Sequence, residues 1–302
     1  MFPSSINHCV LWTLNHFEKY FNKNIINVQT MQNDINKFFE AMNKIIDLRK
    51  QVNKIKKIFK IFKFAKKQNF GELVKYSIKK YFKFFIYNIN DLLLFYPPDK
   101  ISKETGLKFW TGNKIIPHPL KFDANDNFCI GFFKSFSCLL ANCLNIDIKN
   151  INIDDYINEC LRSFKSKKPK KKTFENTGYC KEKIKELKEN INSYIKDNSQ
   201  KIKLNPIQYQ KDTTNENEIN YIYYSSSLRA NNYNIPQFDK MKIKIIAGKI
   251  MPALITTTAS ISGLLALQLY VICQNNNVNN FRIGLIDFSD NTLSLGIPVL
   301  KK

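Results

Sequence analysis

Apolar residues recur at helical spacing through most of the first 200 positions. Between residues 6 and 21 they stand three or four apart, as Ile6, Val10, Leu14, Phe17 and Phe21. This spacing predicts a helix with one apolar face. Residues 31–48, 128–145 and 151–164 continue the pattern, and 178–197 predicts a more polar helix. The first two thirds of the chain are therefore expected to be all-helical.

The segment 54–87 combines an apolar stripe with eleven lysines and one acid, Glu72. The stripe keeps helical spacing and runs on slightly beyond the segment: Ile55, Ile58, Phe59, Phe62, Val74, Ile78, Tyr81, Phe82, Phe85 and Ile89. A basic amphipathic helix can lie on an anionic membrane or on nucleic acid. Such a stripe more often faces a protein core while the charged side chains stay in solvent, so we expect a core helix. Pro97 and Pro98 end it, because proline cannot continue a helix.

The pattern changes near residue 204. Residues 219–224 favour a strand by propensity, although a helix is possible, and 243–255 contains short β-branched runs. Residues 281–288 alternate as a strand does. This last third therefore predicts a piece of an α/β domain. One or two strands cannot close a sheet, so the piece requires a partner, either another chain or further sequence.

An uncharged stretch at 250–273 is long enough to cross a bilayer. Pro252, a run of threonines, two serines and Gln268 interrupt it. We therefore expect a buried strand–turn–helix, and no transmembrane span.

Composition narrows the class of protein. The chain has 302 residues and 44% hydrophobic residues, so it is too apolar for intrinsic disorder and long enough to bury a core. Its net charge is +22, but only four of the 47 basic residues are arginine, the residue best suited to clamp phosphates and read bases. The lysine excess is more typical of an AT-rich genome than of a nucleic-acid surface. A non-catalytic module that binds nucleic acid or anionic membrane through 54–87 and 165–172 remains the alternative, and 165–172 could also be a nuclear localisation signal.

No complete active site is visible in the residues themselves. The seven cysteines form no CxxC pair and the three histidines are scattered, so we expect no metal site and reduced thiols in a cytoplasmic and nuclear protein. No glycine-rich phosphate loop is present. Cys9 follows His8, but adjacent residues on a helix point in different directions, so this pair does not indicate a nucleophile.

Two blocks of sequence resemble the catalytic-cysteine domain of ubiquitin-activating enzymes and its return into the active adenylation domain. The first block contains Pro97, Pro98, Asp99, Phe109, Trp110, Pro117, His118, Pro119 and Asp123. The second contains Leu228, Arg229, Ala230, Asn232, Tyr233, Gly248, Pro252, Thr256, Thr257 and Thr258. Phe2, Pro3, Ile6, His8 and Trp12 also fit the helix that follows the family's catalytic cysteine. The Pro-Pro-Asp and Pro-His-Pro elements favour the ubiquitin branch of the family.

The resemblance implies a mostly α fold with two parts. Residues 1–203 would be the helical catalytic-cysteine domain, and 204–302 an incomplete α/β segment from a ThiF-like adenylation domain. The motif residues are expected to be structural: Arg229 supports the adenylation domain, and Thr256, Thr257 and Thr258 cap the start of a helix.

The resemblance also implies an activity. The family adenylates the C-terminus of ubiquitin with ATP and Mg²⁺, captures it as a thioester on a cysteine, and passes it to a ubiquitin-conjugating enzyme. The catalytic cysteine is expected upstream of Met1, and ATP and Mg²⁺ are expected to bind upstream adenylation domains outside this chain. The chain alone is therefore expected to be inactive. An activator of another ubiquitin-like modifier is the alternative within the family.

Ubiquitin is expected to contact the strand near the end of the chain. The candidate contacts are Phe281, Leu285, Ile286 and Phe288. No specific nucleic acid is expected as a partner.

Overall fold

The computed structural model describes residues 2–101, 106–112, 114–164, 177–197, 201–211, 213–249, 255–274, 277, 280–287, 290 and 292–297. The chain divides into two compact units, Met1–Ile250 and Met251–Lys302. The domain boundary that we expect at residue 203 stays a prediction, but α10 and α11, which follow it, belong to the first compact unit.

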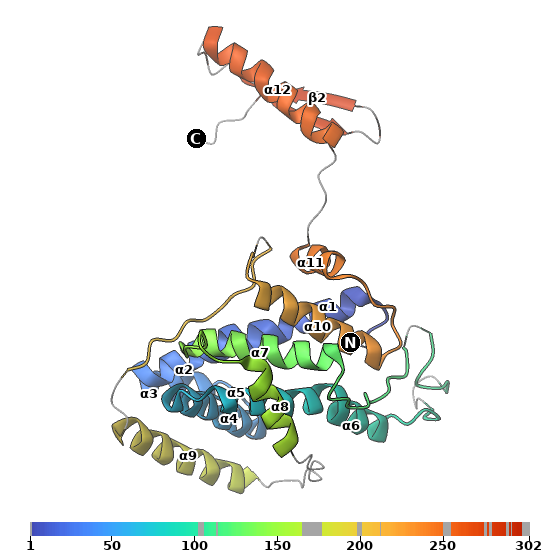
Figure 1. Cartoon of the computed structure of the whole chain (residues 1–302). Helices are drawn as coiled ribbons and strands as arrows, with labels where there is room; N and C mark the ends of the chain where they lie inside the picture. Colours follow the sequence, from blue (N-terminus) through green and yellow to red (C-terminus); the bar gives the residue numbers. More distant parts are fainter. Residues whose placement is uncertain are drawn as a thin grey trace. The chain divides into compact units, whose positions relative to one another are not determined.

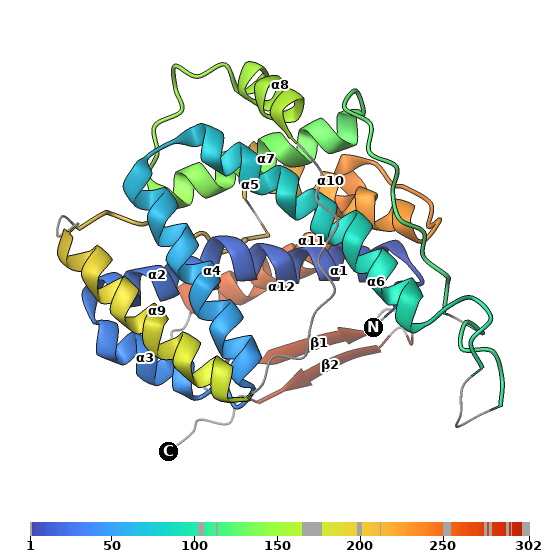
Figure 2. The ribbon, with the colours of Figure 1, turned by 90° about the horizontal axis from the view of Figure 1, so that it is seen from below.

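The first unit is helical. Its elements are α1 (Ile6–Phe17), the π-helix η1 (Glu18–Lys23), α2 (Asn24–Asn33), α3 (Ile35–Asn43), α4 (Leu48–Lys67), α5 (Phe70–Tyr81), the π-helix η2 (Phe82–Tyr87), α6 (Asn88–Phe95), α7 (Asn127–Leu144), α8 (Ile153–Ser163), α9 (Thr177–Asp197), α10 (Glu216–Asn232) and α11 (Lys240–Gly248). Helix α7 lies at the centre and packs against α5 and α10, while α10 also packs against α1 (Figures 1 and 2).

Side-chain caps fix where several of these helices begin. The carboxylate of Asp126 accepts a hydrogen bond from the Phe128 N–H at the start of α7, and Asp47 and Asp239 do the same for α4 and α11. A cap of this kind satisfies N–H groups that have no partner inside the helix. The helices expected at 6–21, 128–145, 151–164 and 178–197 are confirmed, although a π-helical turn replaces the end of the first.

The lysine-rich segment faces the core, as its apolar stripe predicts. All the stripe residues named above are buried. The stripe does not form one uninterrupted helix, because Gln68 adopts a left-handed conformation (φ 49°) after α4 and Asn69 then caps α5. Its last residues lie in η2 and α6. The expectation that the lysines stay in solvent is wrong at Lys80, which is only 8% exposed. Lys54, Lys57, Lys63 and Lys66 are half-buried.

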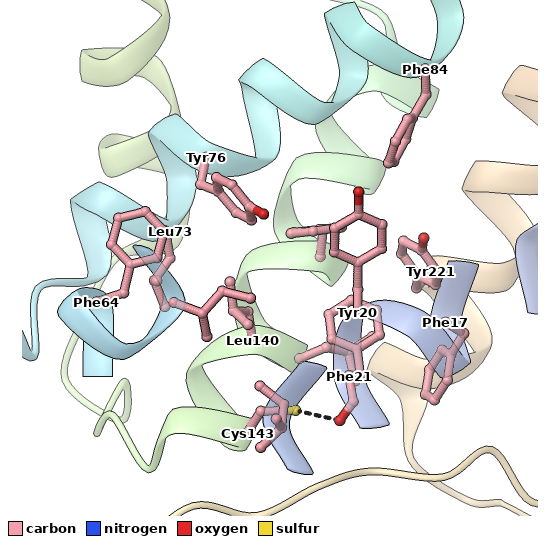
Figure 3. Packing of buried hydrophobic residues seen from close by; sticks show 14 of the residues in the cluster. Phe17, Tyr20, Phe21, Phe64, Leu73, Tyr76, Phe84, Leu140, Cys143 and Tyr221 are labelled. Carbon is pink, nitrogen blue, oxygen red and sulfur yellow. Dashed lines mark hydrogen bonds between the residues drawn. The ribbon is translucent and has the colours of Figure 1, made fainter. Parts of the chain in front are cut away.

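Aromatic side chains fill the core of the helical unit (Figure 3). Phe21 of η1 meets Phe136 of α7 and Tyr221 of α10 with ring centroids 5.2 and 5.1 Å apart. The two π-helical turns also meet, because the Tyr20 and Phe84 rings lie 5.7 Å apart. Burial of such large rings is a dominant favourable term in folding.

The segment 219–224, for which propensity favours a strand but a helix is possible, and the first β-branched residues of 243–255 are helical. Residues 219–224 lie in α10, and the run that begins at residue 243 forms the end of α11. Tyr221, Ile222, Ser225 and Leu228 are all buried, a spacing that suits a helix and no single strand face. Packing against α7 and α1 therefore overrides the strand propensity of Tyr and Ile.

The second unit contains the helix α12 (Ile255–Gln274) and the strands β1 (Ile283–Asp287) and β2 (Thr292–Gly296). The strands are antiparallel, with Leu285 opposite Ser294 and Ile286 opposite Leu293. The strand expected at 281–288 is confirmed at Ile283–Asp287, and Phe281 and Arg282 precede it. The strand expected ahead of α12 is not observed up to residue 249, and residues 250–254 lie outside the described residues.

Both α7 and α12 are long and apolar enough to cross a membrane. In α7, 72% of the apolar stretch Asn127–Leu144 is buried within the chain, as expected for a core helix. None of the α12 window is buried, so the expectation of a buried helix at this position is wrong for this chain by itself.

Candidate functional site

The motif residues of the first unit meet around the end of α10 and the beginning of α1. Asn232, the last residue of α10, is fully buried. Its Nδ2 donates to the carbonyl oxygens of Phe85 (2.9 Å) and His118 (2.8 Å), and its own carbonyl oxygen accepts from the His118 N–H (2.7 Å). One amide therefore joins three segments that are far apart in the sequence.

The Pro117–Pro119 segment suits this arrangement because proline has no N–H to donate. His118 carries the only backbone N–H of these three residues, and that N–H donates a hydrogen bond to the Asn232 carbonyl oxygen. The His118 side chain is exposed while Pro117 is buried, so the backbone and not the imidazole makes the contact. Leu120 adds a hydrogen bond from its N–H to the Phe85 carbonyl oxygen. The structural role expected for this loop stays a prediction, and these backbone hydrogen bonds are contacts that such a role requires.

An aromatic clamp holds the residues that precede α1. The Phe2 ring lies 5.7 Å from the Phe109 ring and 5.2 Å from the Trp110 ring, both edge-on. Tyr96 stacks on Phe109 at 4.3 Å, and the Trp110 Nε1–H donates to the Tyr96 carbonyl oxygen (2.9 Å). We call Phe2, Tyr96, Phe109 and Trp110 the aromatic clamp. It fixes the chain immediately ahead of α1.

Arg229 belongs to α10, and its side chain reaches Trp12 of α1. It has no carboxylate partner among the ion pairs of the described residues. Its guanidinium carbon stands 4.9 Å from the Trp12 ring and 4.8 Å from the Tyr233 ring, and its Nη2 donates to the Tyr233 hydroxyl (3.2 Å). Burial lowers the pKa of Arg229, and the phenol of Tyr233 and the thiol of Cys9 partly oppose that shift. Stacking between rings is a role that the planar guanidinium fills and an ammonium does not.

The thiol closest to this cluster is a poor nucleophile. Cys9 is fully buried, and burial raises its pKa to about 11 despite the opposing charge of Arg229. Burial likewise raises the pKa of Cys129 to about 12 and that of Cys138 to about 11. Only a thiolate attacks acyl groups efficiently, so these groups are in their unreactive form at neutral pH. Among the described residues, no three His, Cys, Asp or Glu side chains are placed to hold a metal ion.

The other motif residues of the first block lie on the surface or in the core without forming a cleft of their own. Pro97, Pro98 and Asp99 follow α6 and are exposed, and the exposed Asp123 accepts from the Asn125 N–H (2.9 Å). In the second block, Leu228, Ala230 and Tyr233 are buried, and Gly248 is the last residue of α11. Pro252 lies outside the described residues.

The predicted capping role of the three threonines stays a prediction, because residues 250–254 lie outside the described residues. Thr256, Thr257 and Thr258 lie in the first turn of α12, which starts at Ile255 in the described part of the chain. The Thr256 carbonyl oxygen accepts from the Ser260 hydroxyl, which is a bond within the helix.

The candidate ubiquitin contacts lie on or beside β1. Leu285 is 68% exposed, Ile286 points to the other face of the strand and is partly buried, and Phe281 precedes β1. Phe288 lies outside the described residues. Because successive strand residues alternate between faces, Leu285 and Ile286 cannot share one flat contact surface.

Sequence reasoning missed one partner in the site. The Phe85 carbonyl oxygen accepts hydrogen bonds from the Leu120 N–H and from Asn232 Nδ2. Phe85 lies in the π-helical turn η2. No sequence pattern distinguishes this turn from the α-helix on either side of it. The aromatic run 81–85 is the only signal, and it indicates a core position and no more.

Comparison with known proteins identifies the family of the chain. The family described as "Ubiquitin-activating enzyme, SCCH domain" matches residues 3–244. The ubiquitin-activating enzyme E1 1 of Schizosaccharomyces pombe is 32% identical over 310 residues, which cover 96% of this chain and 30% of that protein. The ubiquitin-like modifier-activating enzyme 1 of Dictyostelium discoideum is 30% identical over 98% of this chain and 29% of its own length. The mouse protein of the same name is 26% identical over 95% of this chain and 28% of its own.

Proposed function

Because the chain belongs to the ubiquitin-activating enzyme family, we propose that it is one part of an enzyme that charges ubiquitin for transfer to ubiquitin-conjugating enzymes. The chain spans less than a third of the length of the relatives it matches. The activity, the partners, a cytoplasmic and nuclear location and the adenylation-domain origin of residues 204–302 are therefore parts of the proposal. The observation that carries it is the aromatic clamp.

The clamp holds the residues that lie next to the expected nucleophile in the sequence. The resemblance places the catalytic cysteine just ahead of Phe2 and Pro3. In the structure, Phe109 and Trp110 hold Phe2 from a loop about a hundred residues further along the chain. In this proposal the clamp positions the backbone that carries the acceptor thiol. It is a positioning element, because its own side chains have no group that could react with an acyl carbonyl.

The proposed chemistry is acyl transfer to a thiolate. The sulfur attacks the carbonyl carbon of the ubiquitin acyl-adenylate, the new C–S bond forms, and the C–O bond to AMP breaks with the electron pair leaving on the phosphate. Cys9 does not suit this step, since its thiol is fully buried and its pKa is raised to about 11. The described residues do not fit ATP or Mg²⁺ either, because they contain no glycine-rich loop and no group of metal ligands. We place both outside this chain.

A thioester assay tests the proposal. Labelled ubiquitin, ATP and Mg²⁺ are incubated with this chain and with a version extended upstream through the catalytic cysteine and the adenylation domains. Only the extended protein is expected to form a thiol-sensitive adduct. If the 302-residue chain is charged by itself, the nucleophile lies within it and the proposal is wrong.

The clamp is tested separately in the extended protein. Trp110→Ala should reduce thioester formation while ATP–pyrophosphate exchange, which reports adenylation, continues. Leu107→Ala is the matched control, because Leu107 lies in the same loop but is 63% exposed. Equal thioester yields from both variants would contradict the positioning role. A competition with other ubiquitin-like modifiers distinguishes the branch of the family.

A further inference from the structure

A second cluster lies away from the motif residues, where two lysines converge on one tyrosine. Lys80 of α5 donates from Nζ to the Tyr20 hydroxyl (3.2 Å), and Lys57 of α4 stands with its Nζ 3.7 Å from the centre of the Tyr20 ring. Lys80 is 8% exposed and Lys57 is half-buried. A lysine as buried as Lys80 is rare unless an opposite charge accompanies it.

No carboxylate compensates these amines. Neither lysine takes part in the ion pairs found between described residues. The charged groups that act on them are Lys19 of η1, Lys54 and Lys60 of α4, and Lys83 of η2. Glu72 of α5 acts on Lys60. Burial, followed by these like charges, lowers the pKa of Lys57 to about 7 and holds that of Lys80 well below its usual value.

The cluster also contains a hydroxyl group without a hydrogen-bond partner, that of Tyr76. The Tyr76 hydroxyl is buried and makes no hydrogen bond, although the residue is only 5% exposed. Lys80 Nζ lies 4.5 Å from the centre of the Tyr76 ring, and the hydroxyl is directed toward the Tyr20 side of the core (Figure 3). A buried hydroxyl without a partner is destabilising, so its presence needs an explanation.

We propose that Lys57, Lys80 and the hydroxyls of Tyr20 and Tyr76 bind a small phosphate oxyanion of the pyrophosphate class. On binding, the two amines take up protons and supply positive charge, and the Tyr76 hydroxyl supplies a donor that has no partner in the anion-free protein. Because Lys80 donates to the Tyr20 oxygen, the Tyr20 hydrogen is free to be donated to the anion. The surrounding positive charge attracts a multiply charged ligand. It comes from the lysines that act on the two amines: Lys19, Lys54, Lys60 and Lys83.

The burial of Lys80 favours a compact soluble anion over a larger surface. An amine that is 8% exposed presents too little surface for a flat membrane or a nucleic-acid backbone to contact it. The matching of several N–H and O–H donors to several oxygens is the usual basis of phosphate binding. This site is independent of the proposed thioester chemistry.

Calorimetric titration of the full chain with inorganic pyrophosphate tests the proposal, with sodium chloride at matched ionic strength as the blank. Binding and a rise in melting temperature are expected. Lys80→Met should weaken binding by about tenfold or more, whereas Lys56→Met, an exposed lysine of α4, should change it by less than about twofold. Tyr76→Phe should weaken binding without destabilising the anion-free protein, because the hydroxyl has no partner there.

A second measurement uses the protonation of the amines. At pH 8, titration in two buffers of different ionisation enthalpy should show proton uptake on binding, because the anion favours the charged lysines. The proposal is overturned if pyrophosphate gives no heat and no melting shift beyond the chloride blank. It is also overturned if Lys56→Met weakens binding as much as Lys80→Met, or if an oligonucleotide or anionic vesicles bind while pyrophosphate does not.

Discussion

Asn232 shows how one side chain can hold a motif together. Its amide donates to two carbonyl oxygens, and its backbone accepts the one N–H of the Pro117–Pro119 segment. The residue types could be recognised in the sequence, but their mutual contact could not. Asn232 and His118 are 114 positions apart, and no local pattern specifies which distant carbonyl a buried amide reaches.

Asn232→Ala is expected to destabilise the chain by about 2–3 kcal/mol, because two buried carbonyl oxygens lose a donor. Urea unfolding measures the change. Asn231→Ala, whose side chain accepts from the exposed Gln237, is the control and should cost less than about 0.5 kcal/mol. Similar losses in both variants would show that the hydrogen bonds of the Asn232 side chain do not contribute to stability.

His16 makes stability depend on pH. Burial lowers its pKa to about 4, and its Nδ1 lies 2.9 Å from the Trp12 carbonyl oxygen. Between about pH 6.5 and pH 4 the unfolded chain binds a proton at this residue and the folded chain does not, so stability falls as the pH falls through that range. His16→Phe should reduce this slope in unfolding experiments at several pH values, with His118→Asn as the control for losing a histidine. An unchanged slope in His16→Phe would contradict the prediction.

At the scale of elements, the helical spacing predicted α7, α8 and α9 well because each is amphipathic or almost wholly apolar. It failed at α10, whose Tyr and Ile favour strands locally. The physical reason is close packing. Gly131 of α7 lies so near the Tyr224 ring of α10 that an added Cβ would come within 2.4 Å of it.

Gly131→Ala is therefore expected to destabilise the helical unit by about 1–3 kcal/mol, even though alanine favours helices. Gly178→Ala in α9 is the matched control, since its Cβ would meet no atom within 4 Å, and it should not destabilise. Chemical denaturation of both variants measures the difference. If Gly131→Ala is the more stable of the two, α7 and α10 do not approach as closely as described.

At the scale of the whole molecule, the two apolar helices differ in what surrounds them. Helix α7 is the centre of the helical unit, whereas α12 buries no residue within the chain. Apolarity alone could not distinguish them, because both satisfy the length and composition of a membrane span. What differs is whether other segments of the chain supply a covering surface.

Hydrogen exchange should report this difference. Amides of α12 are expected to exchange roughly tenfold or more faster than those of α7, because local opening there breaks almost no buried contacts. Mass spectrometry of peptides from the monomeric chain measures both. Equal protection of α12 and α7 would mean that the second unit is covered in solution.

The sequence by itself determined the mostly helical first unit, the core stripe of the lysine-rich segment and membership of the family, because periodicity and ordered motifs are local properties. Tertiary structure alone decided that α10 and α11 are helices and that the thiol of Cys9 is unreactive. It also decided that Phe2 lies on Trp110 and that Lys57 and Lys80 meet at Tyr20. Each of these depends on which distant residues exclude water or donate a hydrogen bond, and burial sets both the pKa of a group and the conformation of its segment.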